Sequence, residues 1–199
     1  FWTIDGTANN IDIQNFFIEF NDFGQKFLTH KNIKGKSTVQ VSLATVIDGN
    51  MNIDMDRLYS VANFSIQKGE LIDQTTLIDI ADYFASNKIV KTVIDTELLK
   101  KKIKHVKFAN LDNKIIIDKG KIHIPQMTLS TNVMDLNISG IHGFDDNVDY
   151  HLNFRLNDLL VKNKNQDEFG PIKDDGLGIK LFLHMYGNLS DLKYRLDNK

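Results

Sequence analysis

The decapeptide "NVDYHLNFRL" at residues 147–156 alternates strictly between apolar and polar side chains. Successive side chains of a β-strand point to opposite faces, so this alternation predicts a strand with one apolar and one polar face. The apolar face carries Val148, Tyr150, Leu152, Phe154 and Leu156. Such a face either packs against a protein core or is offered to an apolar ligand.

The same alternation recurs in "STVQVSLATV" at residues 37–46 and in "GIKLFLHMYG" at residues 178–187. Runs of strands joined by short turns, without a regular helix between each pair, favour antiparallel pairing. The sequence therefore predicts a mainly β (α+β) fold, a large curved antiparallel sheet or β-groove with a few packed helices. The apolar positions of the two further segments are Val39, Val41, Leu43, Leu181, Leu183 and Met185.

Helical spacing occurs at two places, residues 12–24 and 73–86. Apolar residues recur there at i, i+3, i+4 and i+7, which predicts amphipathic helices. Asn10 or Asp12 can cap the first helix, and Gly24 can end it. Both polar faces carry acidic residues rather than the Lys and Arg typical of helices that lie on membranes, so we expect the helices to pack against the sheet. The apolar positions are Ile13, Phe16, Phe17, Phe20, Leu77, Ile80, Ala81 and Phe84.

Composition limits the classes of function. The 199 residues, of which 42% are hydrophobic and 25% charged, fit a single globular domain over residues 1–199. A net charge of −2 provides no field to attract phosphate backbones, so nucleic-acid binding is not expected. The chain has no cysteine and no apolar run long enough to span a bilayer. It begins "FWTIDGTANN" without Met, and we expect it to be an excerpt of a longer membrane-anchored protein.

No motif indicates a reaction. The segment "DGNMNIDMD" at residues 48–56 resembles a calcium loop, but Ile53 and Tyr59 stand where that loop requires Gly and Glu. The segment "EFGPIKDDGLGIK" at residues 168–180 lacks the Lys-Ser/Thr ending of a phosphate-binding loop. The six histidines show no metal-binding spacing, so a zinc site would have to be assembled from distant strands. The sequence predicts no enzyme, no cofactor and no metal.

Four short elements, taken in order, resemble the C-terminal region of AsmA-like proteins of Gram-negative envelopes. They are "GELID" at 69–73, "IHIPQM" at 122–127, "GIHGFD" at 140–145 and "DDGLG" at 174–178. The resemblance covers most of the chain, from the first predicted helix to the end. The family is similar to TamB and to bridge-like lipid-transfer proteins, whose long curved sheets hold acyl chains along an apolar face.

The resemblance implies a non-enzymatic domain in the periplasm, anchored to the inner membrane through a segment outside this chain. Such a domain would bind or conduct phospholipid between the inner and outer membranes and so support outer-membrane biogenesis. The alternative is a structural or interaction module of outer-membrane assembly, with envelope proteins as partners and no lipid groove. Strand alternation alone assigns the candidate groove for phospholipid acyl chains to Val39, Val41, Leu43, Val148, Tyr150, Leu152, Phe154, Leu181, Leu183 and Met185.

Overall fold

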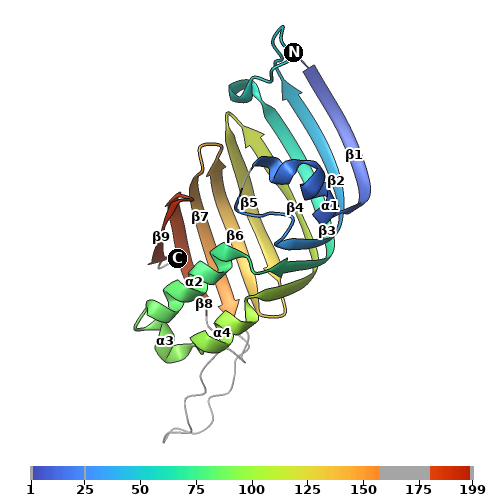
Figure 1. Cartoon of the computed structure of the whole chain (residues 1–199). Coiled ribbons are helices and arrows are strands. Elements are labelled where there is room, and N and C mark those ends of the chain that lie inside the picture. Colours follow the sequence, from blue (N-terminus) through green and yellow to red (C-terminus); the bar gives the residue numbers. More distant parts are fainter. Residues whose placement is uncertain (1, 25, 157–179, 198–199) are drawn as a thin grey trace, which may run out of the picture.

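The computed structural model describes residues 2–24, 26–156 and 180–197, and these form one nine-stranded antiparallel sheet (Figure 1). The strands follow one another in chain order from β1 to β9, so every neighbouring pair is joined directly along the chain. This confirms the predicted mainly β fold with a large antiparallel sheet. The strands are β1 (Trp2–Asp12), β2 (Ile33–Thr45), β3 (Tyr59–Ile72), β4 (His105–Asp118), β5 (Lys121–Ser130), β6 (Met134–Gly143), β7 (Asn147–Leu156), β8 (Lys180–Asn188) and β9 (Asp191–Asp197).

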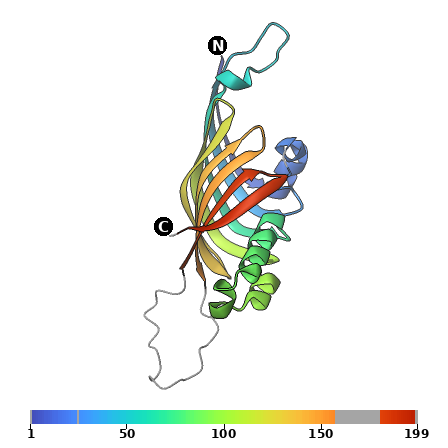
Figure 2. The same ribbon diagram turned by 90° about the vertical axis from the view of Figure 1, so that its left-hand side faces the viewer.

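The α-helices of the described residues lie on one side of the sheet, as Figure 2 shows. We call this side the helix face and the opposite side the outer face. The helices are α1 (Ile13–Glu19), α2 (Thr75–Ser86), α3 (Val90–Val93) and α4 (Thr96–Lys102), and two 3-10 turns are η1 (Asn21–Gly24) and η2 (Met55–Arg57).

The two predicted helices begin at side-chain caps. The Asp12 carboxylate accepts a hydrogen bond from the Asn15 backbone N–H at 3.1 Å and starts α1, which satisfies an N–H group that has no partner within the helix. The buried Gln74 side chain does the same for α2, accepting from the Leu77 N–H at 2.8 Å. Helix α1 ends at Glu19, earlier than predicted, and η1 completes the segment to Gly24.

Helices α3 and α4 were not predicted. Asp95 caps α4 by accepting from the Leu98 N–H at 3.0 Å, and three lysines, Lys100 to Lys102, stand in its last turn. Positive charge is favourable near a helix C-terminus, where the backbone carbonyl groups point outward. The three lysines therefore stabilise the C-terminal end of α4. The apolar residues of this short segment show too little helical periodicity for the helix to be recognised from the sequence.

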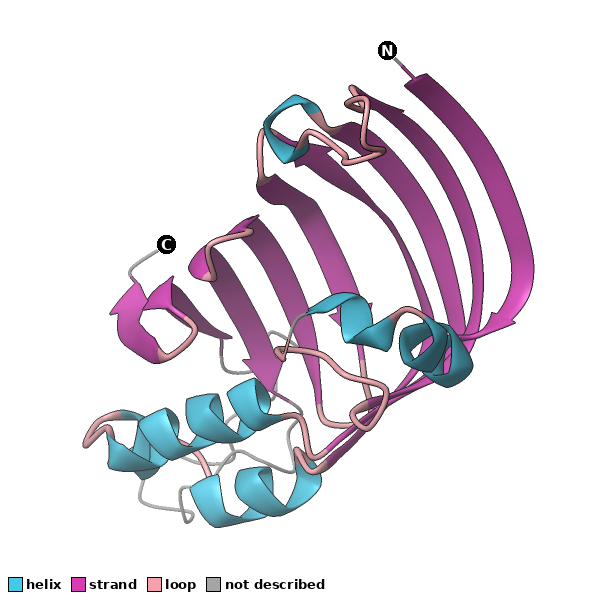
Figure 3. Cartoon of the chain, turned by 45° about the horizontal axis from the view of Figure 1, so that its top comes forward, coloured by secondary structure: helices cyan, strands magenta, loops and turns pink. Residues whose placement is uncertain are grey.

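The sheet bends strongly along its length, as Figure 3 shows. One irregularity lies at Pro125, where the β5–β6 register shifts between Ile124 and Met127. Proline has no N–H to donate to a sheet, so it is accommodated at a bulge. Strands β4 and β5 pair only near their shared turn, from Ile116 to Asp118 on the β4 side. The sheet therefore has a well-paired part, β1–β4, joined at an angle to a second well-paired part, β5–β9.

The core extends over the helix face from Ile13 of α1 and Ile33 of β2 to Met185 of β8, and one part of it lies between α2 and strands β6–β9. Phe84 of α2 contacts Phe154 of β7 edge-to-face at 5.5 Å between ring centroids, and Tyr83 packs on Tyr194 of β9 at 5.6 Å. The largest fully buried side chains are Phe84, Phe154, Ile80, Ile94, Leu99, Ile103, Met134, Leu156, Leu183, Met185 and Val90.

Candidate functional site

All ten predicted groove residues lie on the helix face. Residues directly opposite each other in neighbouring strands share a face, and the register pairs Val39 with Phe64 and Phe154 with Leu181. The same face continues across the β4–β5 turn, where Ile117 is opposite Ile122. Strand alternation therefore assigned the side of the sheet correctly.

The structure nevertheless divides these ten residues into two groups. Those of β7 and β8 are core residues, because α2 covers Phe154 and the ring of Phe27 stacks on Tyr150 at 6.3 Å. Phe154 is only 1% exposed. The expectation of a groove at these strands is therefore corrected: a ligand has no access to side chains that the protein's own helix and loop cover. The corrected residues are Val148, Tyr150, Leu152, Phe154, Leu183 and Met185, and Leu181 is partly buried against the same core.

Val39, Val41 and Leu43 belong to the second group. They are half-buried and stand outside the core cluster formed under α2. Their neighbours on the helix face of β1 remain largely uncovered, since Trp2 is 53% and Ile4 is 56% exposed. We call this surface the open strip and define it by Trp2, Ile4, Val39, Val41, Leu43, Ala62, Ile115, Ile117 and Ile122, which adjoin one another through the registers of β1 to β5.

The open strip carries no charge. Among the described residues of β1–β5, the polar side chains that share its face are Ser37, Thr45, Ser60 and Asn113, all uncharged. Ser60 is buried and donates its hydroxyl to the Ser42 carbonyl oxygen at 3.1 Å, so it presents no unsatisfied group to a ligand. The outer face of the same strands is mostly polar. Val61 and Ile116 lie on it together with Asp5, Gln40, Ser42, Asn63, Ser65, Asp112 and Lys114.

Sequence reasoning missed six members of the open strip. Ile115 and Ile117 stand in "KIIID", where the intervening Ile116 hides the alternation. Trp2 and Ile4 lie in a segment rich in Asn, Asp and Gly, residues that weaken a strand signal. Ala62 and Ile122 are assigned to this face only by the register, which places Ala62 opposite Ile115 and Ile122 opposite Ile117.

Two titratable groups border the covered part of the helix face. Burial raises the pKa of Tyr150 to about 12, and its hydroxyl lies 3.3 Å from Nδ1 of His142. Burial also lowers the pKa of His142, against the opposing charges of Asp146 and Asp145. Both groups are therefore held in their uncharged forms near neutral pH, in keeping with the apolar character of this face.

The loop that resembles a calcium site stabilises a turn. The Asp48 carboxylate accepts hydrogen bonds from the backbone N–H groups of Asn50 at 2.8 Å and Asn52 at 2.9 Å, and from the Asn52 side chain at 3.0 Å. The Asn52 side chain, followed by these backbone groups, lowers the pKa of Asp48. Its oxygens thus orient the connection between β2 and β3.

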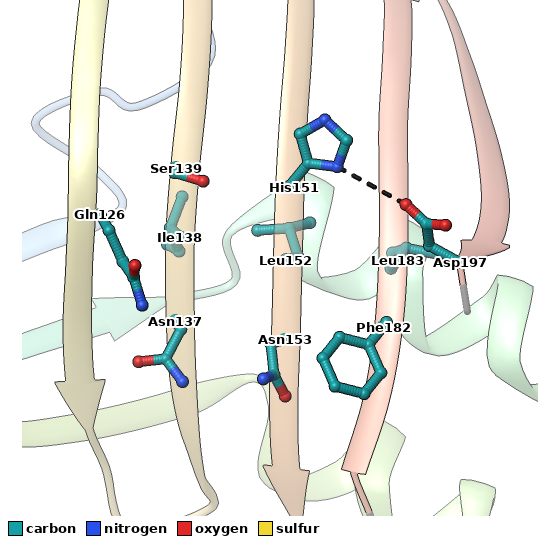
Figure 4. A pocket seen from close by; sticks show the side chains of 10 residues that line it. All are labelled: Gln126, Asn137, Ile138, Ser139, His151, Leu152, Asn153, Phe182, Leu183 and Asp197. Atoms are coloured by element: carbon teal, nitrogen blue, oxygen red, sulfur yellow. Dashed lines mark ion pairs between the residues drawn. The ribbon is translucent and has the colours of Figure 1, made fainter. Parts of the chain in front are cut away.

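The outer face has a shallow hollow that is lined by residues of β5 to β9, which Figure 4 shows. Its volume of about 180 Å³ is below the range of roughly 300–1,000 Å³ usual for drug-sized ligands. Asn153 Oδ1 is buried there without a hydrogen-bond partner among the described residues. The hollow is lined by Gln126, Asn137, Ile138, Ser139, His151, Leu152, Asn153, Phe182, Leu183 and Asp197. Its mainly polar side chains and small size make the open strip the better candidate for an apolar ligand.

The "DDGLG" loop at 174–178 and the glycine-containing segment before β8 lie outside the described residues. In the described part of the chain, no helix has both the length and the apolar character needed to cross a bilayer. Comparisons with protein-family models, with curated proteins and with solved structures found no match for this chain.

Proposed function

We propose that this chain is a non-enzymatic domain that shields phospholipid acyl chains on the open strip. The observation that carries the proposal is the division of the helix face: α2 covers strands β6–β9, whereas the apolar side chains of the open strip on β1–β5 remain half-buried or exposed. A contiguous exposed apolar surface on a folded domain is typical of a site for a ligand, membrane or partner.

The dimensions of the open strip suit an acyl chain. Neighbouring strands lie about 4.8 Å apart, so the five strands span about 19 Å across the strip. One leaflet of a bilayer contributes about 15 Å to a hydrocarbon core of about 30 Å. An acyl chain lying across the strands can therefore rest on the strip along its whole length, with each buried methylene worth about 0.8 kcal/mol.

The charge distribution is consistent with the same ligand. Acyl chains form no hydrogen bonds or ion pairs, and the open strip offers almost no groups for them. Its polar neighbours are uncharged, and the Ser60 hydroxyl already donates a hydrogen bond within the protein. A sugar, nucleotide or peptide ligand requires polar partners for its own donors and acceptors, since a buried polar group without a partner is costly. The open strip favours hydrocarbon over these ligands.

The biological setting of the proposal comes from the resemblance to AsmA-like proteins. In that setting the domain faces the periplasm, is anchored to the inner membrane through a segment outside this chain, and passes phospholipid towards the outer membrane. Two elements of the resemblance coincide with defined features of the fold: "GELID" leads from β3 into α2, and "IHIPQM" contains the β5 bulge.

Site-specific photo-crosslinking tests the proposal. A photoreactive amino acid at Ile115 points into the open strip, whereas the same group at the adjacent Lys114 points to the outer face. We expect crosslinks to phospholipid from position 115 in Gram-negative cells and a much weaker signal from position 114. Equal lipid labelling from the two positions, or none from either, contradicts the proposal.

A charge placed in the strip provides the functional arm of the experiment. Val41→Asp introduces a carboxylate at the centre of β2, and Gln40→Asp introduces the same charge on the outer face one residue away. Both variants are first checked for folding by circular dichroism. We expect Val41→Asp to lose lipid crosslinking at position 115 and Gln40→Asp to retain it; a folded Val41→Asp variant with undiminished labelling argues against the acyl-chain site.

A second candidate function is an interaction module of envelope assembly. The observation that favours it is the edge of β1, an 11-residue strand that pairs only with β2 among the described residues. Exposed strand edges can pair with a strand of another protein. Crosslinks from photoreactive groups in β1 to a protein, together with the absence of lipid crosslinks from position 115, would favour this function.

A further inference from the structure

Strand pairing on the outer face brings together two histidines that are 33 residues apart in the sequence, His151 of β7 and His184 of β8. They are directly opposite each other, and their rings stack at 4.6 Å between centroids with planes only 5° apart. Asp149 lies two residues before His151, on the same face. Its Oδ1 atom is 2.9 Å from Nε2 of His184 and 3.6 Å from Nε2 of His151.

We propose that Asp149, His151 and His184 form a binding site for a divalent transition-metal ion of the zinc class. One ligand atom from each residue lies within 4.8 Å of the others. Two imidazole nitrogens and a carboxylate oxygen form a ligand set that zinc accepts, with bonds of about 2.0–2.2 Å, which places ligand atoms about 3.3 Å apart in a tetrahedral site. Asp149 and His151 are exposed, so their side chains can turn by the small amount required, and solvent can fill the remaining position.

Asp197 lies beside His151. Its Oδ2 atom is 3.7 Å from Nδ1 of His151 (Figure 4), whereas Asp149 approaches the other ring nitrogen, Nε2. A carboxylate that accepts the Nδ1 proton leaves the lone pair of Nε2 free for a metal, and such outer partners commonly orient metal-binding histidines. At 3.7 Å the two atoms are too far apart for a hydrogen bond, so Asp197 can orient His151 in this way only when the two side chains move closer together on metal binding.

Arg195 has the opposite effect on His184. Its Nη2 atom lies 3.0 Å from Nδ1 of His184, and a guanidinium group can only donate. Nδ1 must therefore accept this hydrogen bond, and Nε2 carries the proton that faces Asp149. Metal binding at Nε2 requires that proton to leave and Nδ1 to become protonated, so that His184 stays neutral. Arg195 must then turn away, which means that it weakens metal binding without touching the ion.

Zinc titration of the whole chain by calorimetry tests the site. We expect one zinc ion per chain. The zinc affinity should fall at least about tenfold in His151→Ala and in His184→Ala, since even the loss of a residue that only supports a metal ligand commonly lowers the affinity that much. Arg195→Gln should bind zinc more tightly than the natural chain, because the glutamine side-chain oxygen can accept a hydrogen bond from the protonated Nδ1 of His184. The matched control is His105→Ala, which removes a histidine paired with a single carboxylate, Glu70, at 2.7 Å.

A second measurement is independent of the variants' folding. Imidazole nitrogen resonances of the natural chain should shift on zinc addition for His151 and His184 but not for His105. Equal zinc affinity in the natural chain, His151→Ala and His184→Ala overturns the proposal. It is also overturned if the His151 and His184 resonances do not respond to zinc, or if Arg195→Gln binds zinc more weakly.

Discussion

The ring of Phe84 in α2 meets the ring of Phe154 in β7 edge-on, with centroids 5.5 Å apart and planes at 87°. This contact decides how the alternating strand at residues 147–156 is used. Its apolar face is covered by the protein's own helix, so the strand builds the core. The uncovered apolar face lies instead on β1–β5, beyond the reach of α2, and the proposed lipid site follows from this difference in cover.

Phe84→Ala is expected to destabilise the domain by about 3–5 kcal/mol, because it leaves a cavity at a fully buried aromatic contact. Chemical denaturation monitored by circular dichroism measures the change. Ile89→Ala provides the control, since that side chain is exposed and its loss should alter the free energy of unfolding by no more than about 0.5 kcal/mol. Similar effects of the two substitutions would contradict the assignment of α2 as the cover of the core.

Leu152→Asp and Phe154→Asp should prevent folding, because each substitution places a charge in the buried core.

Gly69→Ala is expected to cost about 1–3 kcal/mol through overpacking. The ring of Phe108 lies directly over Gly69 in the neighbouring strand, and an added Cβ would overlap the ring atoms. Gly6→Ala is the matched control in β1, where no atom lies within 4 Å of the added carbon. Thermal unfolding should show a loss of stability for Gly69→Ala and none for Gly6→Ala. If Phe108→Leu does not reduce the cost of Gly69→Ala, the proposed overlap is wrong.

Stability should fall as the pH drops below about 6.5, the ordinary pKa of histidine, in part because of His142. Burial lowers the pKa of His142 in the folded chain, so in the interval between the folded and unfolded values the unfolded chain binds more protons. The stability is present above the unfolded pKa and is lost as the pH falls towards the folded pKa. Urea unfolding at pH 7.5 and pH 5.5 should show a smaller loss for His142→Asn than for the natural chain. An equal loss would mean that His142 is not responsible.

Removing divalent cations should leave the fold intact. The core under α2 is built from apolar side chains, and the three proposed metal ligands lie on the opposite face of the sheet. Melting temperatures with and without a chelator should therefore agree, while added zinc should raise the melting temperature by mass action. Unfolding on chelation would show that a metal holds the domain together, against the prediction made from the sequence.

The sequence by itself determined the secondary structure of much of the sheet and the face on which each apolar residue of β2, β7 and β8 lies. It did so because the period of two is a local property of an extended chain, independent of what packs against it. The signals for the two predicted helices were equally local, since the spaced apolar residues and the capping residues lie close together in the sequence. Helix α4 is no shorter than α1, at seven residues each, but its apolar residues Leu98 and Leu99 are adjacent rather than three or four positions apart, so no helical period appears.

Only the tertiary structure decided which part of the apolar face is covered. Val41 and Leu152 have the same local pattern, yet α2 docks near one and not the other, because docking depends on side chains such as Phe84 that are distant in the sequence. The pairing of His151 with His184 likewise depends on the register of two strands separated by a long connection. Alternation assigns a side chain to a face, but cover and contact are set by the segments that the fold brings to that face.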